Sequence, residues 1–445
     1  MSFFYFVWKE KVLEYKITNL HKESQIMNIS GDLIDFIDAS PSCYHAVANL
    51  AAMLQGYECL REEDAWKIKR GGKYYVIRKD SSMIAFRVPK KDYTGLRITA
   101  AHSDSPCFKV KTRADMVTEA HYTRLNTEKY GGMNMAMWLD RPLSVAGRVI
   151  VKEGDAYVSR LLNIDRDLLL IPSVAIHMKR DINDGFKYDA QVDTLPLLGD
   201  ETAAGRLPKL VAEAAGVAEE DVLGSDLFLY TRQKGCIWGA SGEYISSRAL
   251  DDLQCAYGTM RGFKEAAESA DTLNLCCVFD NEEVGSLTGQ GADSTFLADV
   301  LERINASLGM EKEQLQRAIA AGFMISADNA HAVHPNHPEY ADPTNRPFIN
   351  GGIVMKFHAG QKYTTDGVSE AMFNDVCRRA GVSVQTFTNK SNMEGGSTLG
   401  NLSNRHVSIR TVDIGLPQLS MHSSYETAGT KDTEDLVRAV KTFFE

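Results

Sequence analysis

Four apolar segments, each followed by side chains that can bind a metal or move a proton, constrain this chain most strongly. Each segment has the length and composition of a buried strand. The residues that follow them are His102 after 96–101, Glu282 and Glu283 after 273–279, Asp328 after 323–327, and His422 a few residues after 412–415. In open α/β sheets, ligands bind in the crevice at the carboxyl ends of the strands. The sequence therefore predicts an α/β fold with a functional site at one edge of its sheet.

The adjacent carboxylates Glu282 and Glu283 are the most informative pair in the chain. Neighbouring side chains in an extended backbone point to opposite sides. One carboxylate could therefore bind a metal while the other acts as general base, which is the division of labour that metal-assisted hydrolysis needs. An acidic loop after a core strand is the simpler alternative.

His102 and Asp104 form a His-x-Asp pair at the end of their apolar segment. Side chains two positions apart lie on the same face of a strand, so Asp104 could fix the orientation of a metal-bound His102. A hydrogen-bonded pair at a strand end is the alternative interpretation.

Asp251 and Asp252 precede apolar residues at three- and four-residue spacing, which predicts a helix through about Lys264 with both acids in its first turn. Acids there favour the helix macrodipole, by roughly 0.3–1 kcal/mol each. The other interpretation is a carboxylate that bridges two metals.

Taken together, these residues resemble those of the aspartyl aminopeptidase family, the dodecameric metalloaminopeptidases that include vacuolar aminopeptidase I. The resemblance extends from about Ile29 to Glu445. It rests on the blocks ASPSCYHAV (39–47), AHSDSPC (101–107), RALDD (248–252), DNEEVGS (280–286), SADNAHAVHPN (326–336) and QLSMHS (418–423).

The resemblance implies a site for two Zn2+ ions, with Co2+ or Mn2+ as alternatives. It assigns His102 and Asp328 to one metal, Glu283 and His422 to the other, Asp251 to both, Glu282 as general base, and Asp104 as the residue that orients His102. The family often has Asn after the bridging aspartate, where this chain has Asp252. The intervening peptide bond can be cis in related di-zinc aminopeptidases.

The resemblance also implies substrate and assembly contacts. It places Lys356 and Tyr363 at the substrate, and a cationic Lys356 would suit an acidic side chain at the cleaved residue. Family members form dodecamers built from dimers, and His177 matches a histidine that reaches into the neighbouring subunit's active site. A surface lysine and a core histidine are the corresponding alternatives.

The residue pattern changes between Cys107 and Trp238, where β-type alternation dominates and none of the proposed ligands occurs. We therefore expect a catalytic α/β/α domain with a mixed central sheet, formed by 27–106 and 238–445. A β-rich domain at 107–237 would interrupt it, and the resemblance assigns that domain to dimerisation. Residues 1–26 are expected to form an N-terminal extension.

Two further features are expected to lie near the site without binding metal. His331, His334 and His337 recur every third residue, but two intervening prolines exclude a helix that would align them. Residues 395–398 (Gly-Gly-Ser-Thr) lack the Lys-Ser/Thr of a phosphate-binding loop. We interpret the histidines as loop residues, and 395–398 as a turn at the rim of a substrate pocket.

Composition excludes several classes of protein. A formal net charge of −10 makes nucleic acid an improbable partner. No apolar stretch approaches 18 residues, so no membrane span is expected. The eight cysteines are scattered without a C-x-x-C motif, which favours reduced thiols in the cytoplasm.

The sequence thus predicts a zinc-dependent aminopeptidase that releases N-terminal residues, preferably Asp or Glu, from peptides. A preference for neutral residues, a related di-metal deacylase, and a metal-free scaffold remain as alternatives.

Overall fold

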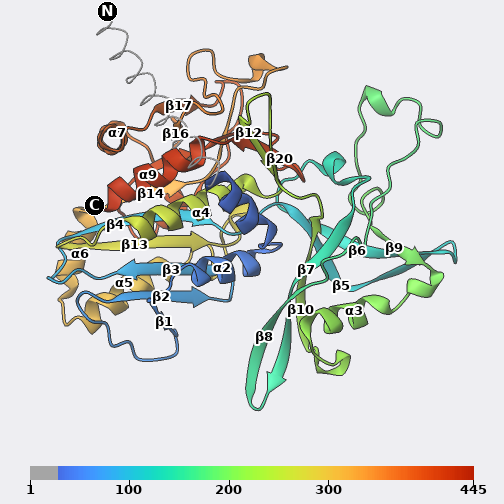
Figure 1. The fold of residues 1–445 in the computed structure, drawn as a ribbon, viewed down its shortest axis with the longest axis horizontal. Helices are drawn as coiled ribbons and strands as arrows, with labels where there is room; N and C mark the ends of the chain where they lie inside the picture. Colours follow the sequence, from blue (N-terminus) through green and yellow to red (C-terminus); the bar gives the residue numbers. More distant parts are fainter. Residues whose placement is uncertain (1–28) are drawn as a thin grey trace, which may run out of the picture.

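The computed structural model describes residues 29–445, and they form two bodies joined side by side (Figure 1). The expected extension at 1–26 lies outside the described residues. The larger body contains a nine-stranded sheet with helices on both faces, and the smaller one contains a six-stranded sheet. The predicted mixed α/β architecture is confirmed.

The nine-stranded sheet has its apolar, parallel strands at the centre. β13, β4, β14 and β18 run parallel, whereas β3 joins β13 and β16 joins β18 in antiparallel pairs. In spatial order the strands are β1 (Glu58–Leu60), β2 (Lys73–Arg78), β3 (Ser82–Arg87), β13 (Thr272–Phe279), β4 (Gly95–His102), β14 (Phe323–Ala327), β18 (Arg410–Gly415), β16 (Ile353–Phe357) and β17 (Val384–Thr388).

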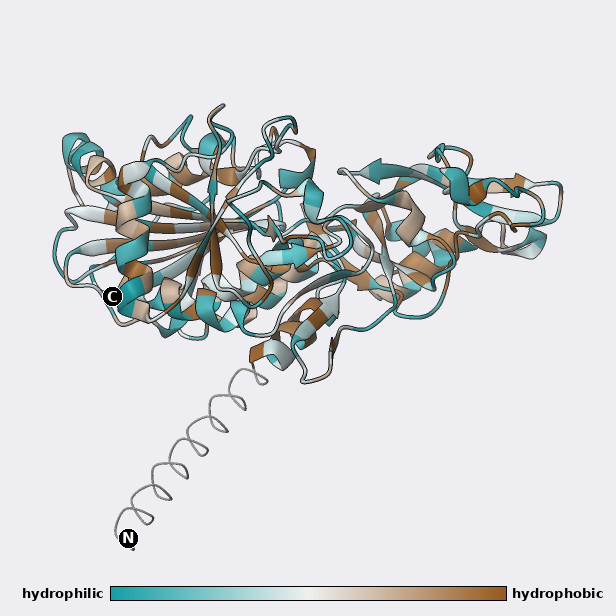
Figure 2. Ribbon diagram, turned by 90° about the horizontal axis from the view of Figure 1, so that it is seen from above, coloured by the Kyte–Doolittle hydropathy of each residue, from teal (hydrophilic) through white to brown (hydrophobic). Residues whose placement is uncertain are grey.

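Two cores cover the two faces of this sheet, because successive strand residues point to opposite sides. In β13, Leu275 and Cys277 pack into one core, while Cys276 and Val278 pack into the other. The helix at 29–38, α2 (Cys43–Ala52), α4 (Leu250–Glu265), α7 (Gly367–Ala380) and α9 (Asp432–Phe444) cover one face. α5 (Phe296–Ser307), α6 (Lys312–Ala320) and α8 (Leu399–Ser403) cover the other. Figure 2 shows the hydrophobic strands between helices with hydrophilic outer surfaces.

The six-stranded sheet is antiparallel and carries one helix, α3 (Arg206–Ala215), over its own apolar core. Its strands, in spatial order, are β8 (Ala156–Asn163), β7 (Leu143–Glu153), β10 (Gly224–Thr231), β5 (Cys107–Thr118), β6 (Tyr122–Tyr130) and β9 (Leu197–Asp200). The sheet thus begins at Cys107, where the sequence predicts a change of domain.

A five-stranded sheet lies beside the ends of the central strands. Its strands are β11 (Cys236–Trp238), β12 (Tyr244–Ser247), β20 (Glu426–Gly429), β19 (Pro417–Leu419) and β15 (Ala330–His331). Because β11 pairs with β12, the expected boundary at 237/238 falls inside a strand, and the six-stranded sheet ends at Thr231.

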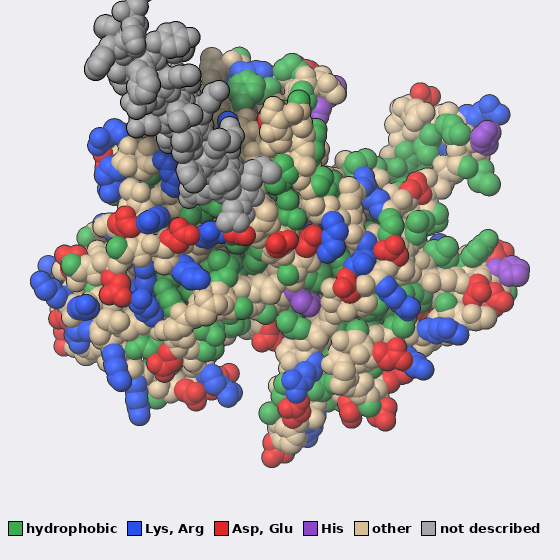
Figure 3. All heavy atoms as spheres, in the orientation of Figure 1, with side chains coloured by type: hydrophobic (Ala, Val, Ile, Leu, Met, Phe, Trp, Pro, Cys, Tyr) green, Lys and Arg blue, Asp and Glu red, His purple; other side chains and the backbone are tan. Residues whose placement is uncertain are grey.

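The surface shows no dominant charge in the view of Figure 3, where acidic and basic side chains are interspersed over both bodies. Among residues 29–445, no helix combines the length and the apolar character that crossing a bilayer requires.

Candidate active site

Parallel strand alignment brings the predicted side chains together. His102 is the last residue of β4 and pairs in register with Phe279, the last residue of β13. Ala327 ends β14, which lies on the other side of β4, so Asp328 follows at the same edge. Because the carboxyl ends of these strands meet, His102, Glu282, Glu283 and Asp328 converge although far apart in sequence.

Asp251 and His422 come from turns that face this edge. Asp251 precedes the regular part of α4, and the peptide bond between Asp251 and Asp252 is cis. Both acids lie in the first turn of α4, as predicted, but both have non-helical backbone angles. His422, at φ +64°, lies in the turn between β19 and β20.

The Asp251 carboxylate lies between two histidines. Its Oδ1 is 3.6 Å from Nε2 of His102, and its Oδ2 is 3.3 Å from Nε2 of His422. Asp328 Oδ1 lies 3.9 Å from the first imidazole, and Glu283 Oε2 lies 3.3 Å from the second. Potential ligand atoms of His102, Asp251, Asp252 and Asp328 thus form one group, and those of Asp251, Glu283 and His422 form another.

Asp104 connects these groups. Nδ1 of His102 donates a hydrogen bond to the Asp104 carbonyl (3.1 Å) and lies 3.3 Å from its carboxylate. This bond holds a proton on Nδ1 and leaves Nε2 facing the cluster. The carboxylate also accepts the backbone N–H groups of Glu282 (3.2 Å) and Glu283 (3.1 Å). One side chain therefore orients a histidine and the Glu-Glu pair.

The backbone of the Glu-Glu pair differs from the extended one predicted. Glu282 to Val284 form a single 3-10 turn, and Asn281 before it adopts a left-handed conformation, which asparagine tolerates better than most residues. The two carboxylates still point to different places, because Glu283 faces His422. Ligand atoms of Glu282, Glu283 and His102 also lie close enough together to form a third group.

Glu426 is a buried residue that sequence reasoning missed. Its carboxylate accepts the backbone N–H of Asp251 (2.9 Å) and that of His422 (2.7 Å). Burial raises the pKa of Glu426 to about 8, and the charge of Asp251 adds to the increase. No sequence pattern around Glu426 indicates these contacts. Asp251 is distant in sequence, and the bond from the His422 N–H lies in a turn that has no periodicity.

Tyr130 and Gly131 were also missed as site residues. The Tyr130 hydroxyl donates to Asp104 (2.7 Å). Gly131 has φ +80°, and a Cβ there would lie 3.1 Å from Cβ of Glu283. Glycine therefore allows the turn after β6 to approach the Glu-Glu pair.

The cluster opens into a cleft with a water-accessible volume of about 440 Å³. Lys356, Tyr363 and His331 line it, as do residues 396–398, which the structure places at the cleft as an irregular segment rather than the predicted turn. His331 lies on β15 rather than in a loop, while the ring of His337 lies beside Glu339, 3.0 Å away. The structure thus brings one of the three histidines to the cleft.

Lys356 is buried, and its ammonium lies 3.4 Å from Asp328 and 5.4 Å from the centre of the Tyr363 ring. Burial lowers the pKa of this lysine, but Asp328, together with Tyr363, Asp413 and Asp251, outweighs burial and raises it. Lys356 is therefore a charged group at the cleft, as an electrostatic role requires. His177 is exposed in the segment between β8 and β9 and does not line the cleft of its own chain.

Carboxylates dominate the electrostatics. Burial raises the pKa of Glu282 to about 8, and Asp328 and Asp104 add to the increase while His102 opposes it. Burial lowers the pKa of His102, but Asp252, Asp104 and neighbouring acids outweigh burial and raise it. The same carboxylates that favour a proton on the imidazole also favour a metal cation bound to the imidazole instead of that proton.

The donor set fits divalent metal ions. Oδ1 of Asp251 and Oε1 of Glu283 are buried and accept no hydrogen bond from any described residue. Buried polar atoms are normally paired, so orphaned carboxylate oxygens beside imidazoles indicate places for cations. Imidazole and carboxylate ligands suit zinc, cobalt or manganese.

Comparison with known proteins agrees with this geometry over nearly the whole chain. The family model described as aminopeptidase I zinc metalloprotease (M18) matches residues 36–444. A probable M18 family aminopeptidase 2 of Clostridium acetobutylicum is 47% identical over 425 residues, covering 93% of this chain and 97% of the relative.

Solved structures show the same fold. A chain in the cryo-EM structure of the Ape4 and Nbr1 complex matches with a TM-score of 0.91 and 34% identity, covering 94% of this chain and 86% of that one. The mApe1 dodecamer of S. cerevisiae matches with a TM-score of 0.81 and 29% identity, covering 94% of this chain and 96% of that one. The predicted resemblance is confirmed, and the chain belongs to the M18 family of metalloprotease aminopeptidases.

Proposed function

We propose that this M18 aminopeptidase uses two zinc-type ions and Glu282 to release N-terminal residues from peptides. The observation that carries the proposal is the Asp251 carboxylate, whose two oxygens face His102 and His422 separately. A single carboxylate placed between two imidazoles, each with a further acid, suits a bridge between two cations.

His102, Asp328 and Asp251 would hold one ion, and Glu283, His422 and Asp251 the other. When bound, such ions polarise a carbonyl and lower the pKa of water. Zinc is the first choice from the family description, with cobalt and manganese compatible with the same ligands.

Glu282 is the candidate proton carrier because it is the acid of the Glu-Glu pair that the two ligand groups around Asp251 leave unused. Its backbone is fixed by Asp104, and its pKa of about 8 lies near neutrality, where a group can both accept and return a proton. A bound dication would lower that pKa. Glu282 would take a proton from the attacking water and deliver it to the departing amine.

Specificity would come from the cleft. The excess of carboxylates favours the ammonium end of a peptide, which accounts for action at the N-terminus. Lys356 supplies positive charge beside Tyr363 for an acidic side chain, although the ion pair with Asp328 shares that charge. We therefore infer a preference for Asp and Glu, with a preference for neutral residues as the alternative.

Assembly is the second part of the proposal. The mApe1 neighbour is described as a dodecamer, and we infer a homododecamer built from dimers for this chain, with 107–237 as the dimerisation domain. His177 lies between Ile176 and Met178, which are 45% and 85% exposed, so its segment offers apolar surface to a partner. His177 would then reach a neighbour's cleft.

We also infer a cytoplasmic enzyme, because all eight cysteines are unpaired and four of them are buried among core residues. A catalytic domain made of 27–106 and 238–445 completes the proposal.

A panel of aminoacyl-anilides tests the function. We expect hydrolysis of aspartyl and glutamyl substrates, loss of hydrolysis after chelation, and recovery when zinc, cobalt or manganese is returned. Hydrolysis only of N-acylated substrates would indicate a deacylase, and metal binding without any turnover would indicate a scaffold. Faster cleavage of leucyl substrates would refute the acidic preference alone.

A further inference from the structure

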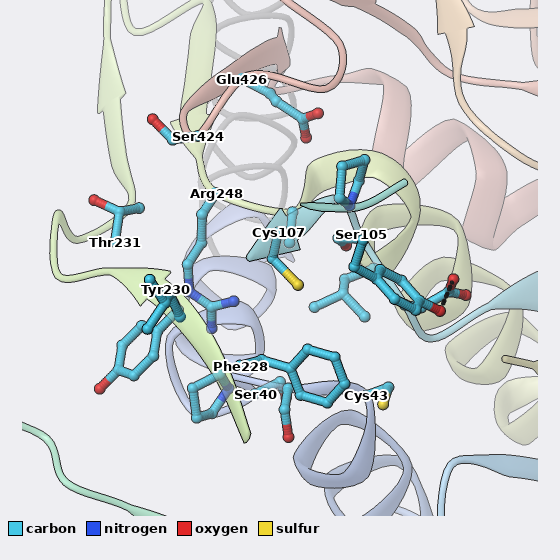
Figure 4. Close-up of a pocket in the computed structure, with 18 of the residues that line it drawn as sticks. Ser40, Cys43, Ser105, Cys107, Phe228, Tyr230, Thr231, Arg248, Ser424 and Glu426 are labelled. Carbon is cyan, nitrogen blue, oxygen red and sulfur yellow. Dashed lines mark hydrogen bonds between the residues drawn. The ribbon is translucent and has the colours of Figure 1, made fainter. Parts of the chain in front are cut away.

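A second cavity lies between the two bodies and shares no lining residue with the cleft. Figure 4 shows it bounded by Cys43 and Ser40 on one side, Phe228 and Tyr230 on another, and Ser424 with Glu426 at the far end. Its water-accessible volume is about 60 Å³. Since about 10–15 Å³ suffices for one water, the cavity has room for a small ion and not for a peptide.

Two buried hydrogen-bond donors line this cavity. Arg248 is 8% exposed, and its guanidinium points into the space between Cys107 and Phe228 (Figure 4). One of its amino groups donates to the carbonyl of Ile37. Trp138 is 3% exposed, and its indole N–H has no hydrogen-bond partner among the described residues. Buried donors of this kind normally have an acceptor.

The charge of Arg248 is only partly balanced. Within residues 29–445, no carboxylate oxygen forms an ion pair with this guanidinium. Asp38 contributes a favourable charge from farther away but is itself paired with Lys234 at 3.4 Å, and the guanidinium lies 5.5 Å from the centre of the Tyr230 ring. Burial lowers the pKa of Arg248 to about 10. Burial and then the charge of Arg248 lower the pKa of the neighbouring His45 to about 4. A buried cation without an anion is costly, so an anion beside it is stabilising.

The two carboxylates that line the cavity are committed elsewhere. Asp104 accepts hydrogen bonds from Tyr130 and the Glu-Glu backbone, and Glu426 accepts those from Asp251 and His422. In Figure 4 the guanidinium of Arg248 lies between the two ends of the cavity and points away from the carboxylate of Glu426. The guanidinium is therefore available to another acceptor.

We propose that this cavity binds a small monovalent anion, held by the Arg248 guanidinium and the Trp138 indole N–H. The aromatic wall of Phe228 and Tyr230 suits a weakly hydrated ion, and the small volume excludes bulky anions. The inference does not rest on the proposed metal chemistry. The site lies close to the active site, because the hydroxyl of Ser105, which also lines the cavity, donates to the carbonyl of Asp251 (2.7 Å).

Thermal unfolding of the full-length protein in sodium chloride, bromide or formate, against sodium gluconate at equal ionic strength, tests the proposal in solution. Gluconate is too large for the cavity. A ligand that binds only the native state raises Tm, so we expect an increase of about 1–2 °C at ten times the dissociation constant, growing with the logarithm of the anion concentration. An increase with formate as well as with halide would show that small carboxylates share the site; an increase with halide alone would restrict it to spherical ions.

Matched variants locate the effect. Arg248→Gln should abolish the increase, and Trp138→Phe, which keeps the ring and removes the donor, should weaken apparent affinity about tenfold. Arg113→Gln makes the same charge change at an exposed position and should respond like the wild type. Crystals grown in sodium bromide should show an anomalous peak between Arg248 and Trp138. Equal Tm values in all salts, or water alone in the cavity of crystals that hold bromide elsewhere, would overturn the proposal.

Discussion

At the scale of single residues, Glu282 is distinguished from Glu283 by what each side chain faces. Glu283 lies 3.3 Å from His422 in a ligand group that contains Asp251, whereas Glu282 is grouped only with His102 and Glu283 and is our candidate for proton transfer. We expect Glu282→Gln to keep both metals and to lower kcat by ~10²–10⁴-fold, the usual contribution of a general acid–base group. Metal content by mass spectrometry and turnover of aminoacyl-anilides check this; near wild-type turnover would show that another group carries the proton.

Asp251 should behave differently, because one side chain serves both ligand groups. Asp251→Ala should weaken the binding of both metals at the same time. Metal titration measures how many ions each chain binds. Asp252→Asn is the matched control: Asp252 accepts the backbone N–H of His102 (3.1 Å), and an asparagine oxygen can do the same. We expect Asp252→Asn to retain both metals. Loss of only one metal in Asp251→Ala would contradict the bridge.

Sequence reasoning placed His102, Glu282, Glu283 and Asp328 at one sheet edge, because each follows an apolar segment that became a central strand. The resemblance to the aminopeptidase family added Asp251 and His422 as metal ligands, and both lie in turns that face this edge. Glu426 and Tyr130 escaped prediction for the opposite reason. Glu426 accepts hydrogen bonds from two backbone N–H groups, and the Tyr130 hydroxyl donates to Asp104; such contacts leave no periodic signal.

At the scale of elements, the turn after β6 is held against the Glu-Glu pair by Gly131. Gly131→Ala places a Cβ 3.1 Å from Cβ of Glu283 and forces alanine to φ +80°. Gly154→Ala, at φ +61° with no atom within 4 Å of the new Cβ, carries the backbone cost alone. Both should lose about 1–2 kcal/mol of stability in urea unfolding. Only Gly131→Ala should lower metal affinity and kcat. If both variants have the same effect on activity, the approach of this turn to Glu283 has no specific role in catalysis.

α2 contributes a titratable group with a defined pH effect. Burial and the charge of Arg248 lower the pKa of His45 to about 4, below the value near 6.5 of an unfolded histidine. The unfolded chain therefore binds the proton first, so stability is complete above about pH 6.5 and falls as the pH drops toward 4. The loss should be at most about 3 kcal/mol.

Urea unfolding of wild type and His45→Gln from pH 7 to 4 measures this effect. As the pH falls, the free energy of unfolding of the wild type should decrease more than that of the variant. Taking the difference between the two proteins separates the effect of His45 from the pH dependence of metal binding. A difference that is independent of pH would rule out titration of His45 as its source.

Elements with strong periodicity matched their predictions closely: the apolar segments became β4, β13, β14 and β18, and the predicted helix became α4. The conformations at their ends did not. Asp251, Asp252 and the Glu-Glu pair have backbone angles set by contacts with other elements, such as Glu426 and Asp104, and local propensity does not encode those contacts.

At the scale of the whole molecule, the shared-site proposal predicts complementation. His177→Ala and Glu282→Gln proteins should each be nearly inactive, because a donor at the oxyanion is worth roughly 3–4 kcal/mol and the base is lost in the other. In a co-refolded equal mixture, half of the dimers are mixed and one of their two sites is intact, so about a quarter of wild-type activity should return.

Sizing chromatography and mass spectrometry of the mixed assemblies provide the control. Mixed oligomers that form without regaining activity, or a fully active monomer, would remove His177 from the site. A dodecamer with independent active sites would support the proposed assembly and contradict the proposal that His177 contributes to a neighbouring site.

The sequence by itself determined which strands would be buried at the centre and which side chains would stand at their carboxyl ends, because hydrophobic alternation and strand polarity are local properties. Only the tertiary structure decided the rest. It placed β4 between β13 and β14, set Asp251 between two histidines, used Glu426 to hold both turns, and buried Arg248 without an ion pair to any residue from 29 to 445. These features depend on pairings between residues tens to hundreds of positions apart, which only the packed chain brings into contact.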